Sequence, residues 1–196
     1  NTHINSKKIA SLIDNADDGM LMLVGVQSNQ FPRSLDIAKP LREKGIKVAI
    51  GGFHVSGMMA MIKGHDTYVQ KALDIGISIF AGEAESRLGQ VLIDAANDKL
   101  KPIYNFLDDL PDIKSSATPL LTAEKVRLTA GRTTSFDAGR GCPFTCSFCT
   151  IINVQGQKSR QRSIESIEHI IHVNVEQGLS SFFISDDNFA RNKNWE

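Results

Sequence analysis

The sequence has no excess of charge of either sign and no long apolar run. Among its 196 residues, 22 are Lys or Arg and 22 are Asp or Glu, so the formal net charge is zero. Nucleic acids and anionic membranes bind basic faces, and the balanced charge predicts neither as a partner. The longest apolar run, Met20–Val24, is far shorter than the ~20 residues that cross a bilayer. No signal-peptide pattern precedes it, which predicts a cytoplasmic protein.

Cysteine is also scarce, and its distribution is uneven. The chain has three cysteines, Cys142, Cys146 and Cys149, all within eight residues. Three such thiols cannot pair evenly, so no disulfide framework fits, in keeping with a reducing cytoplasm. Cysteine thiolates are soft ligands for zinc or iron–sulfur clusters, whose metals take four ligands. The spacing therefore predicts a metal site with three protein ligands in residues 141–149, here called the cysteine loop.

A predicted strand leads into the cysteine loop. Residues 132–138 have a strand pattern and run into Gly139-Arg140-Gly141, which places the cysteines at the carboxyl end of a strand. Active sites of α/β barrels lie at that end. The alternative is a zinc knuckle completed by His169 or His172, which lie three residues apart on a predicted helix.

Upstream of the cysteine loop, predicted strands alternate with predicted helices. The strands are 20–26, 46–50 and 77–81, and the helices are 33–44 and 84–97. The first strand is continuously apolar, which predicts burial on both faces of a parallel sheet. The alternation predicts an α/β fold with a partial doubly wound, Rossmann-like parallel sheet and sites at the carboxyl ends of its strands. The pattern weakens over 99–131, which we interpret as a linker, although 101–106 could form a short edge strand.

The residues after the cysteine loop begin with a basic segment, 158–162. We expect it to be solvated, and contact of its arginines with a ligand carboxylate is the alternative. Ser163 is placed to cap a helix that Gly178 ends. The buried face of this helix is predicted to consist of Ile164, Ile167, Ile170 and Ile171. A strand at 182–185 follows and leads into Asp186-Asp187-Asn188.

The cysteine loop resembles that of the radical S-adenosylmethionine (SAM) superfamily, in its C-x3-C-x2-C spacing and in Phe148 directly before the last cysteine. The resemblance implies that Cys142, Cys146 and Cys149 hold a [4Fe–4S] cluster whose open iron binds SAM, and that Phe148 lies against the adenine. It implies an enzyme in which the reduced cluster cleaves SAM to a 5′-deoxyadenosyl radical. Expected partners are a reductant such as flavodoxin or ferredoxin and a small-molecule or lipid-like substrate. As an alternative, Phe144 and Phe148 simply anchor the loop as buried hydrophobes.

The upstream half resembles the cobalamin-binding-type domain that precedes the radical SAM domain in one large subfamily. The match rests on Ser28 after the first strand, Gly51-Gly52 after the second and Gly82 after the third. It implies a cobalamin site lined by Ser28, Gly51 and Gly52, with ordinary turn glycines as the alternative. In the same subfamily an Asp-Asp pair follows a later strand, which marks Asp186 as a cofactor contact; a polar helix-entry turn is the alternative.

One part of the cobalamin pattern is missing. The subfamily's cobalt-ligating Asp-x-His-x-x-Gly does not occur in this sequence. Two explanations stay open: the ligating loop precedes the sequence, or cobalamin binds without a protein histidine or not at all.

The resemblance also divides the chain. It assigns 1–98 to the cobalamin-binding-type domain, 99–131 to a linker and 132–196 to the start of a radical SAM (β/α) barrel, with parts missing at both ends. The implied function is radical SAM catalysis, with cobalamin-dependent methyl transfer or rearrangement. The alternative is a zinc-binding interaction module without redox catalysis. Because an unclosed barrel leaves a radical open to water, we expect this stretch alone to be inactive.

Overall fold

A computed structural model describes residues 4–14, 19–62, 64, 66–118, 120–128 and 133–191. The chain divides into two compact units, Asn1–Leu110 and Pro111–Glu196. Arg132, the expected first residue of a strand, lies outside the described residues.

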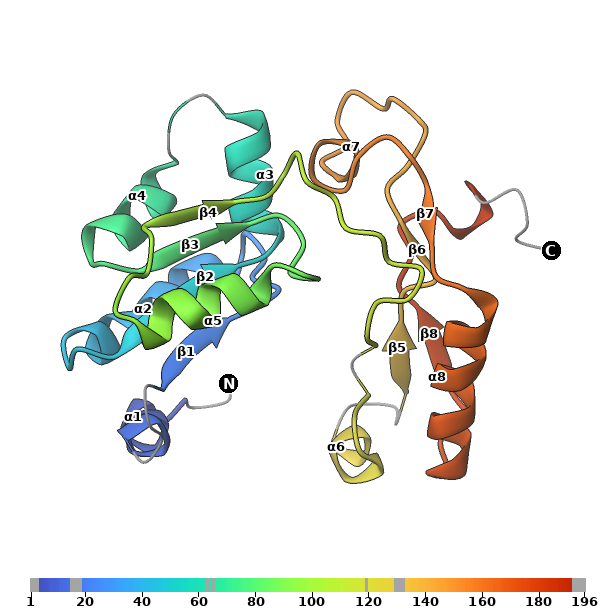
Figure 1. The fold of residues 1–196 in the computed structure, drawn as a ribbon, viewed down its shortest axis with the longest axis horizontal. Helices are drawn as coiled ribbons and strands as arrows, with labels where there is room; N and C mark the ends of the chain where they lie inside the picture. The colour runs from blue at the N-terminus through green and yellow to red at the C-terminus, as the bar shows by residue number, and fades with distance from the viewer. Residues whose placement is uncertain are drawn as a thin grey trace. The chain divides into compact units, whose positions relative to one another are not determined.

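The first unit is built on a parallel four-stranded sheet with the order β1-β2-β3-β4 (Figure 1). Its strands are β1 (Met20–Leu23), β2 (Lys47–Gly51), β3 (Ser78–Ala81) and β4 (Ile103–Asn105). In register, Leu23 lies beside Ile50 and Ile50 beside Ile79. The carboxyl ends of the strands therefore meet at one edge, and the predicted α/β fold with a parallel sheet is confirmed.

Helices cover both faces of this sheet. They are α1 (Ser6–Asp14), α2 (Phe31–Arg42), α3 (Phe53–Met61), α4 (Thr67–Asp74) and α5 (Leu88–Ala96). Because side chains alternate along a strand, Ile79 packs in one core with residues of α2, α3 and α4, whereas Phe80 packs with Val91 of α5. The arrangement is that of a doubly wound sheet.

Two segments differ from expectation. β1 lies at the edge of the sheet in the described part of the chain and is only half-buried, because it pairs with β2 alone. The chain leaves the sheet at Val24, whose side chain is exposed, so the strand is shorter than the apolar run. The stretch interpreted as a linker contains β4, which pairs with β3, so the edge-strand alternative holds there. The division of the chain into functional domains stays a prediction.

The second unit contains two short sheets. β5 (Thr134–Phe136) is parallel to β8 (Phe182–Ile184), and β6 (Gly139–Arg140) is antiparallel to β7 (Arg160–Gln161), as Figure 1 shows. The remaining elements are α6 (Ala123–Arg127), α7 (Ile151–Val154), α8 (Ile164–Glu176) and the 3-10 helix η2 (Phe189–Arg191). α8 connects the parallel pair and packs Ile170 against Phe136, whose ring lies 6.3 Å from that of Phe182.

The ends of α8 are as predicted, but its buried face is narrower. Ser163 Oγ accepts a hydrogen bond from the Ser166 backbone N–H at 3.1 Å, and Gly178 follows the helix with a φ of 79°. Ile170 is buried and Ile167 packs beside it, whereas Ile164 is 72% exposed. Ile171 is also exposed, because the two-stranded β5-β8 sheet covers only one stripe of the helix. None of the described helices is long and apolar enough to cross a membrane.

Candidate functional site

The cysteine loop follows β6 directly, and its three cysteines are free. Cys142 is buried, and its backbone N–H donates to the Gly156 carbonyl at 3.1 Å. Cys146 is exposed and Cys149 half-buried, and the Cys149 N–H donates to the Cys146 carbonyl at 3.1 Å. The last two cysteines therefore lie at the two ends of one tight turn, as the C-x2-C spacing predicts.

The thiols do not converge in this structure. Within the described residues, no group of three or more His, Cys, Asp or Glu side chains is placed to hold a metal ion. Cys142 lies inside the protein, whereas Cys146 faces solvent. His169 and His172, the alternative zinc ligands, are exposed on α8. The support for a metal site therefore comes from residue type and spacing.

Glycine is required where the loop begins. Gly141 has a φ of +78°, and a Cβ at this position would collide with the Lys158 carbonyl oxygen. The Gly141 N–H donates to Gln155 Oε1 at 3.2 Å. A side chain at 141 would therefore push the loop away from the segment that precedes β7.

Residues 137–140 carry the cysteine loop and are called the loop root here. Asp137 Oδ1 lies 3.0 Å from Arg162 Nη2, and Asp137 Oδ2 lies 2.7 Å from Arg140 Nε. Burial raises the pKa of the Asp137 carboxyl, but Arg140 and Arg162 outweigh burial and leave that pKa below its usual value. The expectation of a solvated basic segment is wrong for Arg162, which is 4% exposed and donates to the Ser116 carbonyl at 3.0 Å.

Asp186, a predicted cofactor contact, also reaches the loop root. Its Oδ1 accepts hydrogen bonds from the backbone N–H groups of Ala138 at 2.7 Å and Gly139 at 3.2 Å. The predicted adenine contact, Phe148, is 86% exposed, and Phe144 is exposed as well. The exposure of both rings argues against the alternative in which they anchor the loop.

The predicted cobalamin residues of the first unit come together at the carboxyl ends of β1 and β2. Gly51 accepts the Val26 N–H at 3.0 Å, and Gly52 has a φ of +141°. A Cβ on Gly52 would collide with the Val26 backbone nitrogen, so only glycine permits this approach. Ser28 is exposed on the loop after β1, and its Oγ lies 3.1 Å from His54 Nδ1.

A buried histidine, His54, lies beside Ser28. It is 5% exposed, and its ring centroid lies 4.3 Å from that of Phe31. Its Nε2 lies 3.5 Å from Asp66 Oδ2. Burial lowers the pKa of His54, and Asp66 only partly offsets this, so the ring is neutral near pH 7. Sequence reasoning missed Asp66; its one signal is the position directly before α4, which its side chain caps.

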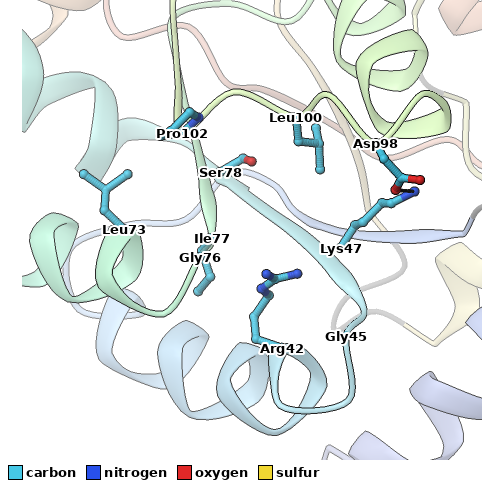
Figure 2. A pocket seen from close by; sticks show the side chains of 10 residues that line it. All are labelled: Arg42, Gly45, Lys47, Leu73, Gly76, Ile77, Ser78, Asp98, Leu100 and Pro102. Carbon is cyan, nitrogen blue, oxygen red and sulfur yellow. Dashed lines mark ion pairs between the residues drawn. The ribbon is translucent and has the colours of Figure 1, made fainter.

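Two cavities lie at opposite ends of the first sheet. One of about 380 Å³ opens at the amino ends of β2 and β3, where Lys47 pairs with Asp98 at 2.7 Å (Figure 2). Arg42 points into it and donates to the Ile46 carbonyl at 2.8 Å. A smaller cavity of about 100 Å³ is apolar and reaches Gly51. Ligands of open α/β sheets bind at the carboxyl ends of the strands. This rule favours the smaller cavity over the larger one as the place where a ligand would bind.

The chain is similar to several methyltransferases. It is 28% identical over 197 residues to bacteriochlorophyllide d C-8(2)-methyltransferase of Chlorobaculum tepidum, which covers 91% of this chain and 41% of that protein. An uncharacterized methyltransferase of Synechocystis sp. is 36% identical over 84 residues, 42% of this chain and 15% of that protein. The chain thus spans less than half the length of these curated relatives. No protein-family model matches the sequence.

Solved structures share the fold. The radical S-adenosylmethionine methyltransferase TsrM from Kitasatospora setae, bound to tryptophan substrate and the SAM analog aza-SAM, superposes with a TM-score of 0.70 at 14% identity. This match covers 94% of this chain and 40% of TsrM. TsrM with cobalamin and a [4Fe–4S] cluster gives a TM-score of 0.64 at 15% identity, with 97% and 42% covered. At these identities the likeness shows the α/β fold.

Proposed function

We propose that the chain is part of a radical SAM methyltransferase that holds a [4Fe–4S] cluster with Cys142, Cys146 and Cys149. The observation that carries the proposal is the presence of three free thiols at C-x3-C-x2-C spacing on one loop at the carboxyl end of β6. The similarity to curated methyltransferases and the fold shared with TsrM support it. Because the chain spans less than half of these relatives, the activity of the whole enzyme is part of the proposal.

The donor set fits such a cluster. Three thiolates would hold three of the four irons of such a cluster. The fourth iron would then be open to bind SAM. When bound, the cluster supplies the electron that cleaves SAM. The loop root holds the cysteine loop in place, and a reducing compartment keeps its thiols reduced. Phe148 presents an exposed ring that is available to stack on the adenine. The electron comes from a reductant such as flavodoxin or ferredoxin.

The proposal includes a cobalamin at the carboxyl edge of the first sheet, where it supplies a methyl carrier when bound. Gly51 and Gly52 allow close backbone approach there, and the Ser28 hydroxyl is exposed. His54 does not fit the role of a cobalt ligand. Its Nδ1 faces Ser28 and its Nε2 faces Asp66, so both ring nitrogens point into the protein. His54 is therefore not assigned as a cobalt ligand.

Metal analysis after anaerobic reconstitution tests the proposal. We expect about four irons and four sulfides per chain, and loss of both when all three cysteines are replaced by alanine. Stoichiometric zinc without iron or sulfide would instead establish the zinc-binding module.

Titration with hydroxocobalamin tests the proposed cobalamin site separately. If the full-length protein does not bind hydroxocobalamin, the first unit is a scaffold that shapes substrate access and holds no cofactor.

A further inference from the structure

The cysteine loop is held at its root by a residue from a distant part of the second unit. Asp186 lies just after the carboxyl end of β8. Its Oδ1 nevertheless accepts the N–H groups of Ala138 and Gly139, which lie just before the cysteine loop. The Ser185 N–H donates to the Phe136 carbonyl at 2.9 Å and brings the two strand ends together. The end of β8 is thereby attached to the start of the loop.

The two N–H groups need this acceptor. Ala138 and Gly139 are buried, so water is a poor substitute as their partner. The Ala138 carbonyl accepts from the Arg162 N–H at 2.9 Å, and Asp186 Oδ1 accepts the Ala138 and Gly139 N–H groups on the other side of this segment. A carboxylate that accepts backbone N–H bonds makes charge-assisted hydrogen bonds, which are among the stronger ones in proteins. Removal of the Asp186 side chain would leave these two buried N–H groups without their acceptor.

We infer that Asp186 is a positioning residue that fixes the cysteine loop for cluster assembly, and that its Oδ1 acts on the protein backbone. This role rests on the proposed function, but it assigns the Asp186 oxygen to Ala138 and Gly139 instead of to a cofactor. The property that matters is an acceptor atom at the Oδ1 position. An asparagine offers that atom without the negative charge, and alanine does not.

Alkylation of the metal-free 196-residue chain tests the inference without reference to any cofactor. Cys142 is buried, so its reaction with iodoacetamide, followed by peptide mass spectrometry, reports opening of the loop. We expect Asp186→Ala to accelerate Cys142 alkylation roughly tenfold or more, and Asp186→Asn to stay within about threefold of wild type. Glu168→Ala, which removes an exposed carboxylate of α8 in the same unit, is the matched control and is expected to react as wild type does.

Three results would overturn the inference: unchanged alkylation in Asp186→Ala, equal acceleration in Asp186→Asn, or equal acceleration in Glu168→Ala. If Asp186→Ala does not fold, Asp186→Glu keeps the charge and displaces the acceptor by one methylene. Acceleration in this variant but not in Asp186→Asn supports the inference, and wild-type behaviour of Asp186→Glu overturns it. Iron uptake is measured in parallel on the same proteins. Failure of the wild type to take up iron would end the proposed function and leave the alkylation result to stand by itself.

Discussion

Arg162 and Asp137 form an ion pair at the loop root, with Nη2 and Oδ1 3.0 Å apart and the arginine side chain 1% exposed. Arg162 Nε also donates to the Asp137 carbonyl at 3.0 Å, and Nη1 to the Ser116 carbonyl at 3.0 Å. One buried side chain thus joins three segments of the second unit. Because each nitrogen of this buried guanidinium donates to a protein acceptor, we assign Arg162 to stability of the loop root and not to ligand binding.

The first prediction concerns this pair. Arg162→Ala removes a buried cation that is one of the two arginine partners of Asp137, so we expect a loss of about 3 kcal/mol in the free energy of unfolding of the second unit. Arg33→Ala is the control, because Arg33 and Asp36 are both largely exposed and 3.8 Å apart, which is worth at most ~1 kcal/mol. Urea denaturation followed by circular dichroism measures both. Similar losses in the two variants would contradict a structural role for Arg162.

The second prediction concerns the glycine at the end of β2. Gly52→Ala places a Cβ against the Val26 nitrogen in a backbone conformation that side chains rarely adopt, so we expect a loss of about 2 kcal/mol or more. Gly89→Ala in α5 is the matched control, since its Cβ meets nothing within 4 Å and alanine favours a helix by up to ~1 kcal/mol. Thermal unfolding should shift in opposite directions. Equal stability of the two variants would show that the Gly52 loop readily rearranges.

The third prediction is a pH dependence set by His54. Because burial lowers the pKa of His54 below its ordinary value of 6.5, the unfolded chain takes up a proton before the folded one as the pH falls. The contribution of His54 to the stability of the first unit is therefore fully present well above pH 6.5 and is lost as the pH falls through 6.5 toward the lowered pKa of the folded state. His54→Asn should flatten this slope between about pH 7.5 and 5.5, whereas His169→Asn, at an exposed position, should not. Urea midpoints across this range provide the measurement, and an unchanged slope in His54→Asn would refute the assignment.

The features that could be predicted are those that produce a pattern among residues close together in the sequence. β2 and β3 are visible as apolar runs because both of their faces are buried, and the cysteine loop is visible because its ligands lie within eight residues. The exposure of Ile164 was not predictable, because the helical period does not reveal how wide the covering sheet is. Polar contacts between distant residues, such as Asp186 with Ala138 or His54 with Asp66, leave no periodic pattern, so the structure alone reveals them.

The fourth prediction concerns the 196-residue chain by itself. In the described part of the second unit, β8 pairs only with β5, and Phe183 is exposed. Radical chemistry needs exclusion of water, which this two-stranded sheet does not provide. We expect the reconstituted chain to take up iron but not to form 5′-deoxyadenosine over repeated turnovers when given SAM and a strong reductant. Chromatographic detection of many equivalents of 5′-deoxyadenosine would show that a closed barrel is not required.

The last prediction separates the two exposed aromatic residues of the cysteine loop. Phe148 directly precedes Cys149 and is the proposed adenine contact, whereas Phe144 is a comparable exposed ring without such a role. Stacking of a base on an aromatic ring is worth about 1–3 kcal/mol, so Phe148→Ala should weaken SAM binding by roughly tenfold or more. Equilibrium dialysis of reconstituted protein with labelled SAM measures this effect. Phe144→Ala should bind SAM as wild type does.

Iron content distinguishes loss of stacking from loss of the cluster. Both phenylalanines are largely solvent-exposed, so neither substitution removes core packing, and both variants should take up as much iron as wild type. A Phe148→Ala protein with full iron content and weakened SAM binding places the adenine at this ring. Equal weakening in both variants would instead indicate a general change in the loop. Wild-type affinity in Phe148→Ala would remove the adenine contact from the proposal while leaving the three thiolates as cluster ligands.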